Sequence, residues 1–222
     1  MTDFISKLKN LKTAVADSIF PVRCPYCGKV IERNDYACFD CKSKFPEKAI
    51  TRYAIGVCKC ASALPYDRIF ANGVKRFKFN NNASYAKQLA VVLVMSILEI
   101  YQGEKFDLIT CVPMHKDGLK ERGYNQAELL AKECAEIMQI PYVDTLEKFR
   151  KNRTQHSIKA SERADNVRGV FRIIDKSIVK NKNILIIDDI ITTGHTLGEC
   201  TRILAKSGCS FVSCATLCSV TM

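Results

Sequence analysis

The chain has 222 residues, of which 34 are Lys or Arg and 23 are Asp or Glu, so its formal net charge at pH 7 is +11. This length suggests one medium domain, or a domain of roughly 150 residues with a smaller appendage. Hydrophobic residues make up 47% and charged residues 26%, a balance that excludes wholesale disorder. The longest apolar run, residues 89–98, is shorter than the roughly 20 residues that a membrane span needs, so no span is expected. The positive surplus favours a polyanion as partner: nucleic acid, a phosphorylated small molecule or an acidic membrane.

The first 62 residues divide into two regions. Apolar residues recur at helical spacing over 4–19 and Pro21 ends the pattern, which predicts an amphipathic helix within residues 1–20. This helix would dock on the body of the protein, or touch a membrane surface through its lysines. Residues 21–62 follow as a second region, rich in cysteine and interrupted by proline and glycine, as is typical of loops and short strands.

From residue 63 to residue 222, predicted helices alternate with predicted strands in a third and largest domain. Helices are expected over residues 83–101, 125–138 and 196–206. Strands are expected over residues 106–113, 142–147, 170–174, 183–187 and 209–217. This alternation predicts an α/β fold with a largely parallel sheet flanked by helices.

The most informative segment follows the strand expected over residues 183–187. Two adjacent carboxylates, Asp188 and Asp189, precede the loop Thr192-Thr193-Gly194-His195-Thr196. Ligands bind outside the carboxyl ends of strands in open α/β sheets, and a helix N-terminus offers unpaired N–H groups to an anion. The loop is therefore a candidate phosphate cradle. The carboxylates would accept hydrogen bonds from sugar hydroxyls or help to hold a divalent cation.

Four of the twelve cysteines form two Cys-x-x-Cys turns, which contain Cys24, Cys27, Cys38 and Cys41. Each turn can direct two thiolates to one point, so together they predict a closed tetrahedral site for structural zinc. A redox role would explain one such turn but not two. Because no secretory signal is recognisable at the start, we expect a reducing, cytoplasmic location.

Residues 184–198 resemble the phosphoribosyl-pyrophosphate (PRPP) signature of the type I phosphoribosyltransferases. Other blocks extend the resemblance to the ComF family, the group of competence protein F and GntX, from about residue 20 to residue 217. These blocks are Lys75-Arg76-Phe77-Lys78-Phe79, Val112-Pro113-Met114-His115, Arg122-Gly123-Tyr124-Asn125-Gln126, Arg153-x-Gln155 and Asn166-Val167-x-Gly169-x-Phe171.

The resemblance implies a phosphoribosyltransferase-like sheet with a hood, joined to a small N-terminal zinc ribbon. It implies that Asp188 and Asp189 meet the ribose hydroxyls of PRPP and are the catalytic pair. The 5′-phosphate would bind at residues 192–196, and the pyrophosphate, with Mg²⁺, beside Pro113 and His115. Transfer would pass through a sugar cation at C1′, so it needs cations on the leaving group rather than a protein nucleophile. The candidates for these cations are Lys78, Arg122 and Arg153.

The family often has a second knuckle pair, where this sequence has only Cys58 and Cys60. Their Cys-x-Cys spacing and the absence of a partner pair indicate remnants of that knuckle. The alternative is that one of them replaces a zinc ligand.

Two functions are compatible with these features. The first is a ComF-type factor of natural transformation that handles incoming single-stranded DNA in the cytoplasm, together with proteins of the competence machinery. Residues 75–78 and 148–163 would then contact the DNA backbone. The second is a metabolic phosphoribosyltransferase that transfers ribose 5-phosphate from PRPP to a base or amine. A third reading combines the two functions: the fold binds PRPP as a sensor and transfers nothing. No segment of the sequence indicates which base or amine would accept the ribose 5-phosphate.

Overall fold

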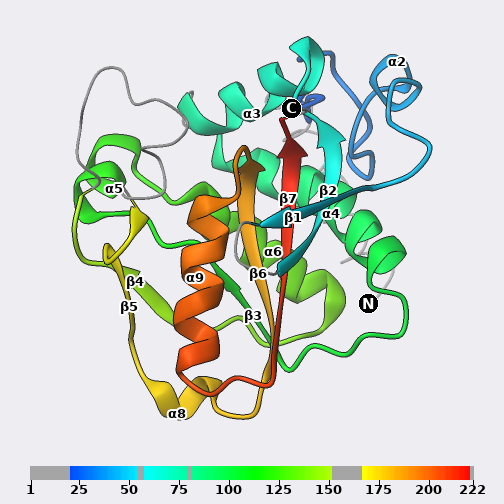
Figure 1. Ribbon diagram of the computed structural model, residues 1–222. Helices are drawn as coiled ribbons and strands as arrows, with labels where there is room; N and C mark the ends of the chain where they lie inside the picture. The colour runs from blue at the N-terminus through cyan, green and yellow to red at the C-terminus, as the bar shows by residue number, and fades with distance from the viewer. Residues whose placement is uncertain (1–20, 55–57, 80–81, 152–166, 221–222) are drawn as a thin grey trace, which may run out of the picture.

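The computed structural model describes residues 21–54, 58–79, 82–151 and 167–220 (Figure 1). The amphipathic helix expected within residues 1–20 and the candidate cation Arg153 lie outside the described residues.

A five-stranded sheet with the strand order β1-β2-β7-β6-β3 forms the centre of the protein. All neighbouring strands are parallel except β1, which is antiparallel to β2. Ile184 to Ile187 of β6 are each 0% exposed, as expected for a central parallel strand that is covered on both faces. The predicted parallel α/β fold is confirmed. The strands are β1 (Ile50–Ala54), β2 (Cys58–Pro65), β3 (Leu108–Cys111), β6 (Asn183–Ile191) and β7 (Phe211–Ser219).

Helices cover both faces of the sheet (Figure 1). α4 (Ala86–Ile100) and α6 (Gln126–Met138) pack on one face and α9 (His195–Lys206) on the other. A separate two-stranded antiparallel sheet, formed by β4 (Leu146–Lys148) and β5 (Phe171–Ile173), lies beside α9. The shorter helices are α2 (Phe39–Lys42), α3 (Arg68–Phe79), η1 (Ala83–Tyr85), α5 (Lys116–Arg122) and α8 (Lys176–Val179).

Helix α3 is absent from the predicted elements, although its signals are present in the sequence. The Asp67 carboxylate caps the helix, because the backbone N–H groups of Ile69 and Phe70 donate to its Oδ1 over 2.9 and 3.1 Å. Phe70, Val74 and Phe77 follow at helical spacing and are all 0% exposed. Basic residues lie between these apolar positions, so the segment resembles an exposed basic loop more than a helix with a buried face.

Strand β2 runs across the domain boundary that the sequence analysis places between residues 62 and 63. It pairs with β7 in the central sheet, and β1 pairs with β2 in turn. Most of β2 is buried, since it lies between two strands and under helices. We therefore propose that the sheet domain begins with β1 and that the cysteine-rich module is limited to residues 21–49.

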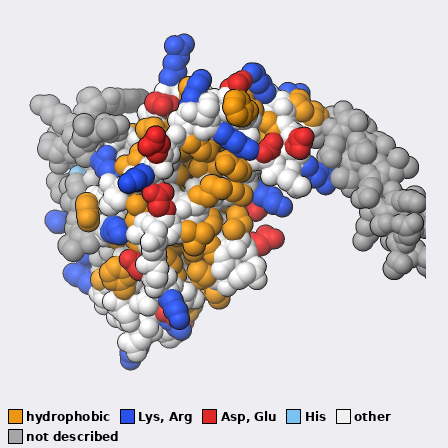
Figure 2. All heavy atoms as spheres, turned by 90° about the vertical axis from the view of Figure 1, so that its right-hand side faces the viewer, with side chains coloured by type: hydrophobic (Ala, Val, Ile, Leu, Met, Phe, Trp, Pro, Cys, Tyr) orange, Lys and Arg blue, Asp and Glu red, His pale blue; other side chains and the backbone are white. Residues whose placement is uncertain are grey.

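Among the described residues, one helical stretch, Ala83–Ile100, is long and apolar enough to cross a membrane, with a mean hydropathy of 1.5. Of this stretch, 44% is buried inside the protein, as in a core helix of an α/β domain. Its outer side still exposes Met95 and Leu98, at 50% and 60%. Figure 2 shows hydrophobic side chains gathered down the middle of this side of the molecule.

The cysteine-rich module docks on α3 through the ring of Tyr26, which is 2% exposed. The ring meets Phe45 and Phe70 edge-on, with centroids 5.5 and 5.4 Å apart. Gly73 of α3 lies directly under it, because a Cβ on Gly73 would come within 2.7 Å of Tyr26 Cδ1. The module and α3 therefore share one closely packed aromatic core.

Changing Gly73 to alanine is expected to destabilise the protein by about 1–3 kcal/mol, because a buried ring must move to admit the methyl group. Urea unfolding measures this change. The control is Gly118→Ala in α5, where the new Cβ would meet only the flexible side chain of Met114 at 3.2 Å. If Gly73→Ala is as stable as the Gly118 variant, the contact between module and helix is looser than described.

Candidate functional site

The strand β6 carries both aspartates of the predicted site to the carboxyl edge of the sheet. β6 continues through Asp188 and Asp189 to Ile191, so the carboxylates belong to the strand instead of following it as the sequence analysis expects. Gly194 then caps α9 with a φ of 79°, a left-handed conformation that favours glycine. The helix begins at His195, one residue earlier than predicted.

The loop between β6 and α9 surrounds a small hollow of about 30 Å³. The backbone N–H groups of His195, Thr196 and Leu197, in the first turn of α9, have no acceptor among the described residues. They add to the positive end of the helix dipole. The loop can therefore hold one anionic group. The hollow is lined by Asp188, Ile190, Ile191 and residues 192–197.

The two aspartates have different electrostatic surroundings. Asp189 is 9% exposed, and its Oδ2 lies 2.7 Å from Nζ of Lys78 on α3. Asp188 accepts the backbone N–H of Asp189 over 2.8 Å and has no such ion pair within the described part of the chain. Burial and the charge of Asp189 raise the pKa of Asp188 to about 7, against the opposing charges of Lys78 and Lys148. The pair thus combines one carboxylate in an ion pair with one whose pKa is raised to about 7.

The other predicted site residues are placed around the loop after β3. His115 caps α5, because its Nδ1 accepts the backbone N–H of Asp117 over 3.3 Å. Pro113 precedes it, partly exposed. Arg122 lies over the ring of Phe79 at 5.4 Å, and in the described structure it makes no ion pair with the aspartates. Of the two predicted cations that the structure describes, Lys78 and Arg122, Lys78 is the one that contacts an aspartate.

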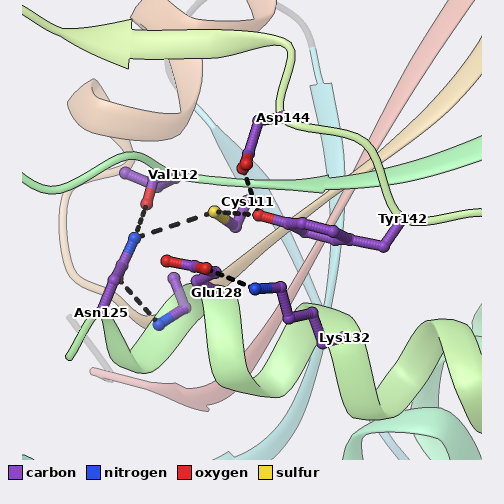
Figure 3. Close-up of polar contacts among 8 residues, drawn as sticks. Cys111, Val112, Asn125, Glu128, Lys132, Tyr142 and Asp144 are labelled. Carbon is purple, nitrogen blue, oxygen red and sulfur yellow. Dashed lines mark hydrogen bonds and ion pairs between the residues drawn. The ribbon is translucent and has the colours of Figure 1, made fainter.

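A polar network fixes the chain where β3 ends (Figure 3). The side chain of Asn125, 7% exposed, accepts the Ala127 N–H over 3.1 Å and donates to the Val112 carbonyl over 3.1 Å. The Tyr142 hydroxyl lies 3.3 Å from Cys111 Sγ on the other side. Asn125 thus couples the start of α6 to the loop before His115. The sequence analysis quotes Asn125 in a motif without assigning it this role.

Lys148 is a site residue that sequence reasoning treats only as the start of a basic stretch. It lies partly buried on β4, close enough to Asp188 for its charge to lower the pKa of that carboxyl. The sequence does contain a sign of this inward position. Side chains alternate between the two faces of a strand, so Lys148 lies on the same face as the buried Leu146.

The four predicted cysteine ligands come together. The Sγ atoms of Cys24, Cys27, Cys38 and Cys41 all lie within 4.8 Å of one another, the size of a site for one metal ion. In the first turn the N–H of Gly28, at a φ of 82°, donates to the Cys24 carbonyl over 2.8 Å. The second turn leads directly into α2.

A guanidinium beside the four thiols supports a metal in this place. Nη1 of Arg76 is buried and without a hydrogen-bond partner within the described residues. It lies against Gly28, because a Cβ there would come within 2.9 Å of it. Four thiolates around a divalent ion carry a net charge of −2, of which this cation would offset one unit. The donor set and its surroundings therefore fit a four-sulfur metal centre.

Cys58 and Cys60 are apart from this group. Both are buried in β2, at 2% and 0% exposed, and Cys58 Sγ lies 3.1 Å from Cys214 Sγ of β7. Among the described residues, the only cluster of metal-ligand type is the one formed by the two Cys-x-x-Cys turns. This gives no support to the alternative that Cys58 or Cys60 replaces a ligand.

Comparison with known proteins agrees with this geometry. The family described as "Phosphoribosyl transferase domain" matches residues 118–221, which include β6, the loop and α9. Competence protein F of Haemophilus influenzae is 31% identical over 140 residues, 61% of this chain and 61% of that protein. The DNA utilization protein YhgH of Salmonella typhimurium is 27% identical over 199 residues, 88% of this chain and 83% of that protein. The chain is thus similar to competence protein F and to the YhgH proteins, and its C-terminal part matches the phosphoribosyl transferase domain.

The phosphoribosyl transferase domain match covers the part of the chain that includes β6, α9 and β7, and the cysteine module lies outside it. A solved adenine phosphoribosyltransferase has 17% sequence identity and a TM-score of 0.43, over 64% of this chain and 74% of that one. The match to the Haemophilus protein spans only 61% of its length, so activity, substrates and partners are treated below as proposals.

Proposed function

We propose that this protein is a member of the ComF family that binds PRPP at the carboxyl edge of the sheet and acts in DNA uptake by handling single-stranded DNA in the cytoplasm. The observation that carries the proposal is the pair Asp188–Asp189 beside a helix start with three unpaired N–H groups. A phosphosugar needs this combination, since its hydroxyls are donors and its phosphate is an acceptor.

In the proposed complex, the 5′-phosphate lies on the loop. The N–H groups of residues 195–197 and the hydroxyls of Thr192, Thr193 and Thr196 donate to it, while the side chain of His195 is directed to solvent. Asp188 and Asp189 accept hydrogen bonds from the ribose hydroxyls, and the ion pair with Lys78 holds the Asp189 carboxylate in place. Pro113, His115 and Arg122 border the pyrophosphate.

Mg²⁺ would accompany the pyrophosphate and neutralise its charge as it leaves. The protein's own contribution is to hold the sugar between fixed carboxylates and a fixed anion site, so that little is left to reorganise when the bond at C1′ breaks. In the cysteine module, the metal we propose is structural zinc, because four thiolates in a closed arrangement favour this ion.

The proposal of DNA handling rests on charge and on the printed names of the relatives. The net charge of +11 favours contact with a polyanion, and the similar proteins are named for competence and DNA utilization. A metabolic phosphoribosyltransferase is the second candidate, favoured by the same Asp188–Asp189 site. Its acceptor would be a base or amine.

A titration of the purified protein with PRPP and Mg²⁺ tests the site, and pyrophosphate release with and without single-stranded DNA tests the chemistry. Under the DNA-uptake proposal, the protein binds single-stranded DNA with an affinity that falls steeply with salt. Under the metabolic alternative, an added base or amine releases pyrophosphate and DNA has no effect. Absence of PRPP binding at millimolar concentration would sink both.

A further inference from the structure

Lys148 stands on the inward face of the small sheet formed by β4 and β5. In the ladder it pairs with Phe171, and its Nζ lies 5.5 Å from the centroid of that ring. Leu146, two residues earlier on the same face, is 4% exposed. The outward face carries Glu147 and Arg172, which form an ion pair of 2.6 Å in solvent. The hairpin thus places a lysine where its alternation calls for an apolar residue.

The Lys148 ammonium makes no ion pair with any carboxylate that the structure describes. Within the described residues no carboxylate lies within 4.0 Å of its Nζ, and no hydrogen bond to it is found. Partly buried charges are normally paired, because losing hydration without a partner is costly. Burial accordingly lowers the pKa of the Lys148 ammonium. The cation–π contact with Phe171 gives the ammonium no hydrogen-bond acceptor, whereas a bound anion would supply one.

The groups that face Lys148 place this anion in the candidate site. Asp188 of β6 and Cys200 of α9 are the titratable groups with which it interacts most strongly. The charge of Asp188 favours the Lys148 ammonium, but the two side chains form no ion pair in the described structure. Lys78, on the opposite helix α3, is already paired with Asp189. Lys148 is therefore the unpaired cation next to the aspartates in the described structure.

We propose that Lys148 binds the pyrophosphate group of the phosphosugar ligand, an inference that rests on the proposed PRPP site. Lys148 does not line the hollow formed by residues 188–197, so the phosphoryl group held there is not its partner. The ligand's remaining anionic group is the diphosphate at C1 of the ribose. The β4–β5 sheet thus contributes a binding residue, not only a cover.

The test compares two ligands, PRPP and ribose 5-phosphate, by calorimetry with Lys148→Met and the wild type. Losing a charged hydrogen bond to the diphosphate is expected to weaken PRPP binding about 10- to 100-fold. Ribose 5-phosphate lacks the diphosphate and should bind both proteins equally. Lys148→Arg should keep most of the PRPP affinity. The matched control is Arg172→Met on the outward face of the same sheet, which should change neither affinity.

The thermal midpoint gives a readout that does not depend on the ligand. Lys148→Met removes an unpaired, partly buried charge, so it should melt at a higher temperature than the wild type. A lower midpoint would make Lys148 a structural residue and overturn the proposal. So would equal PRPP affinity in both proteins, or an equal loss of both ligands. If the wild type binds neither ligand, it is the PRPP site itself that fails.

Discussion

Changing both Asp188 and Asp189 to asparagine is expected to abolish PRPP binding while the protein stays folded. Each carboxylate would accept a charge-assisted hydrogen bond from a ribose hydroxyl, worth about 1.5–3 kcal/mol. Losing both corresponds to roughly 10²- to 10⁴-fold in affinity. Asparagine keeps the size of the side chain, so the strand β6 can retain its packing. Calorimetry with PRPP and Mg²⁺ measures the loss, and circular dichroism checks the fold.

The control for this experiment is Asp175→Asn. Asp175 caps the short helix α8, at the other end of the molecule from the loop (Figure 1), and asparagine caps equally well. It should leave PRPP affinity unchanged. Affinity of the double variant within threefold of the wild type would refute the assignment of the aspartates to the ligand.

The single variant Asp188→Asn adds a test by pH. Because burial and Asp189 raise the pKa of Asp188 from its ordinary 3.8 to about 7, the folded protein binds a proton more tightly than the unfolded chain. Its contribution to stability therefore falls as the pH rises from about 4 to about 7. Unfolding measured across this range should show Asp188→Asn gaining stability relative to wild type. Identical pH profiles would mean that Asp188 is not held in this environment.

The strand, loop and helix at the candidate site could be predicted because their signals are local. Four isoleucine or leucine residues, two acids, a glycine and a helix follow one another within about 25 residues. The cysteine cluster could be predicted for the same reason, since each turn brings its own two thiols together. In both cases chain connectivity alone makes the residues neighbours.

The parts that sequence reasoning missed depend on contacts between distant segments. Lys78 and Asp189 are 111 positions apart in the chain and meet only because α3 packs over the carboxyl edge of the sheet. β1 and β2 join the central sheet because β2 pairs with β7, some 150 residues later in the chain. Their closeness in sequence to the cysteines led to their assignment to the cysteine-rich region. Lys148 is charged, so it is expected to be exposed, although the alternation along β4 places it on the same inward face as Leu146.

Removing the metal from the cysteine module is expected to weaken PRPP binding, although none of the four cysteines of the module lines the hollow of the loop. The module packs on α3 through Tyr26 and Gly73, Arg76 of the same helix lies against Gly28, and α3 carries Lys78 to Asp189. A structural zinc contributes on the order of 10 kcal/mol to folding in zinc-finger peptides, comparable with the whole stability of a domain. Without it the module should unfold and release one side of α3.

The variant Cys38→Ser with Cys41→Ser tests this coupling. We expect loss of bound zinc by elemental analysis, protease cleavage within residues 21–49, and a fall of about tenfold or more in PRPP affinity, equivalent to about 1.4 kcal/mol. Cys209→Ser is the control, since Cys209 is partly exposed and lies outside the metal cluster. If the double variant loses the metal and the module unfolds while PRPP binds as before, α3 is held by the sheet alone and the metal centre has no part in forming the ligand site.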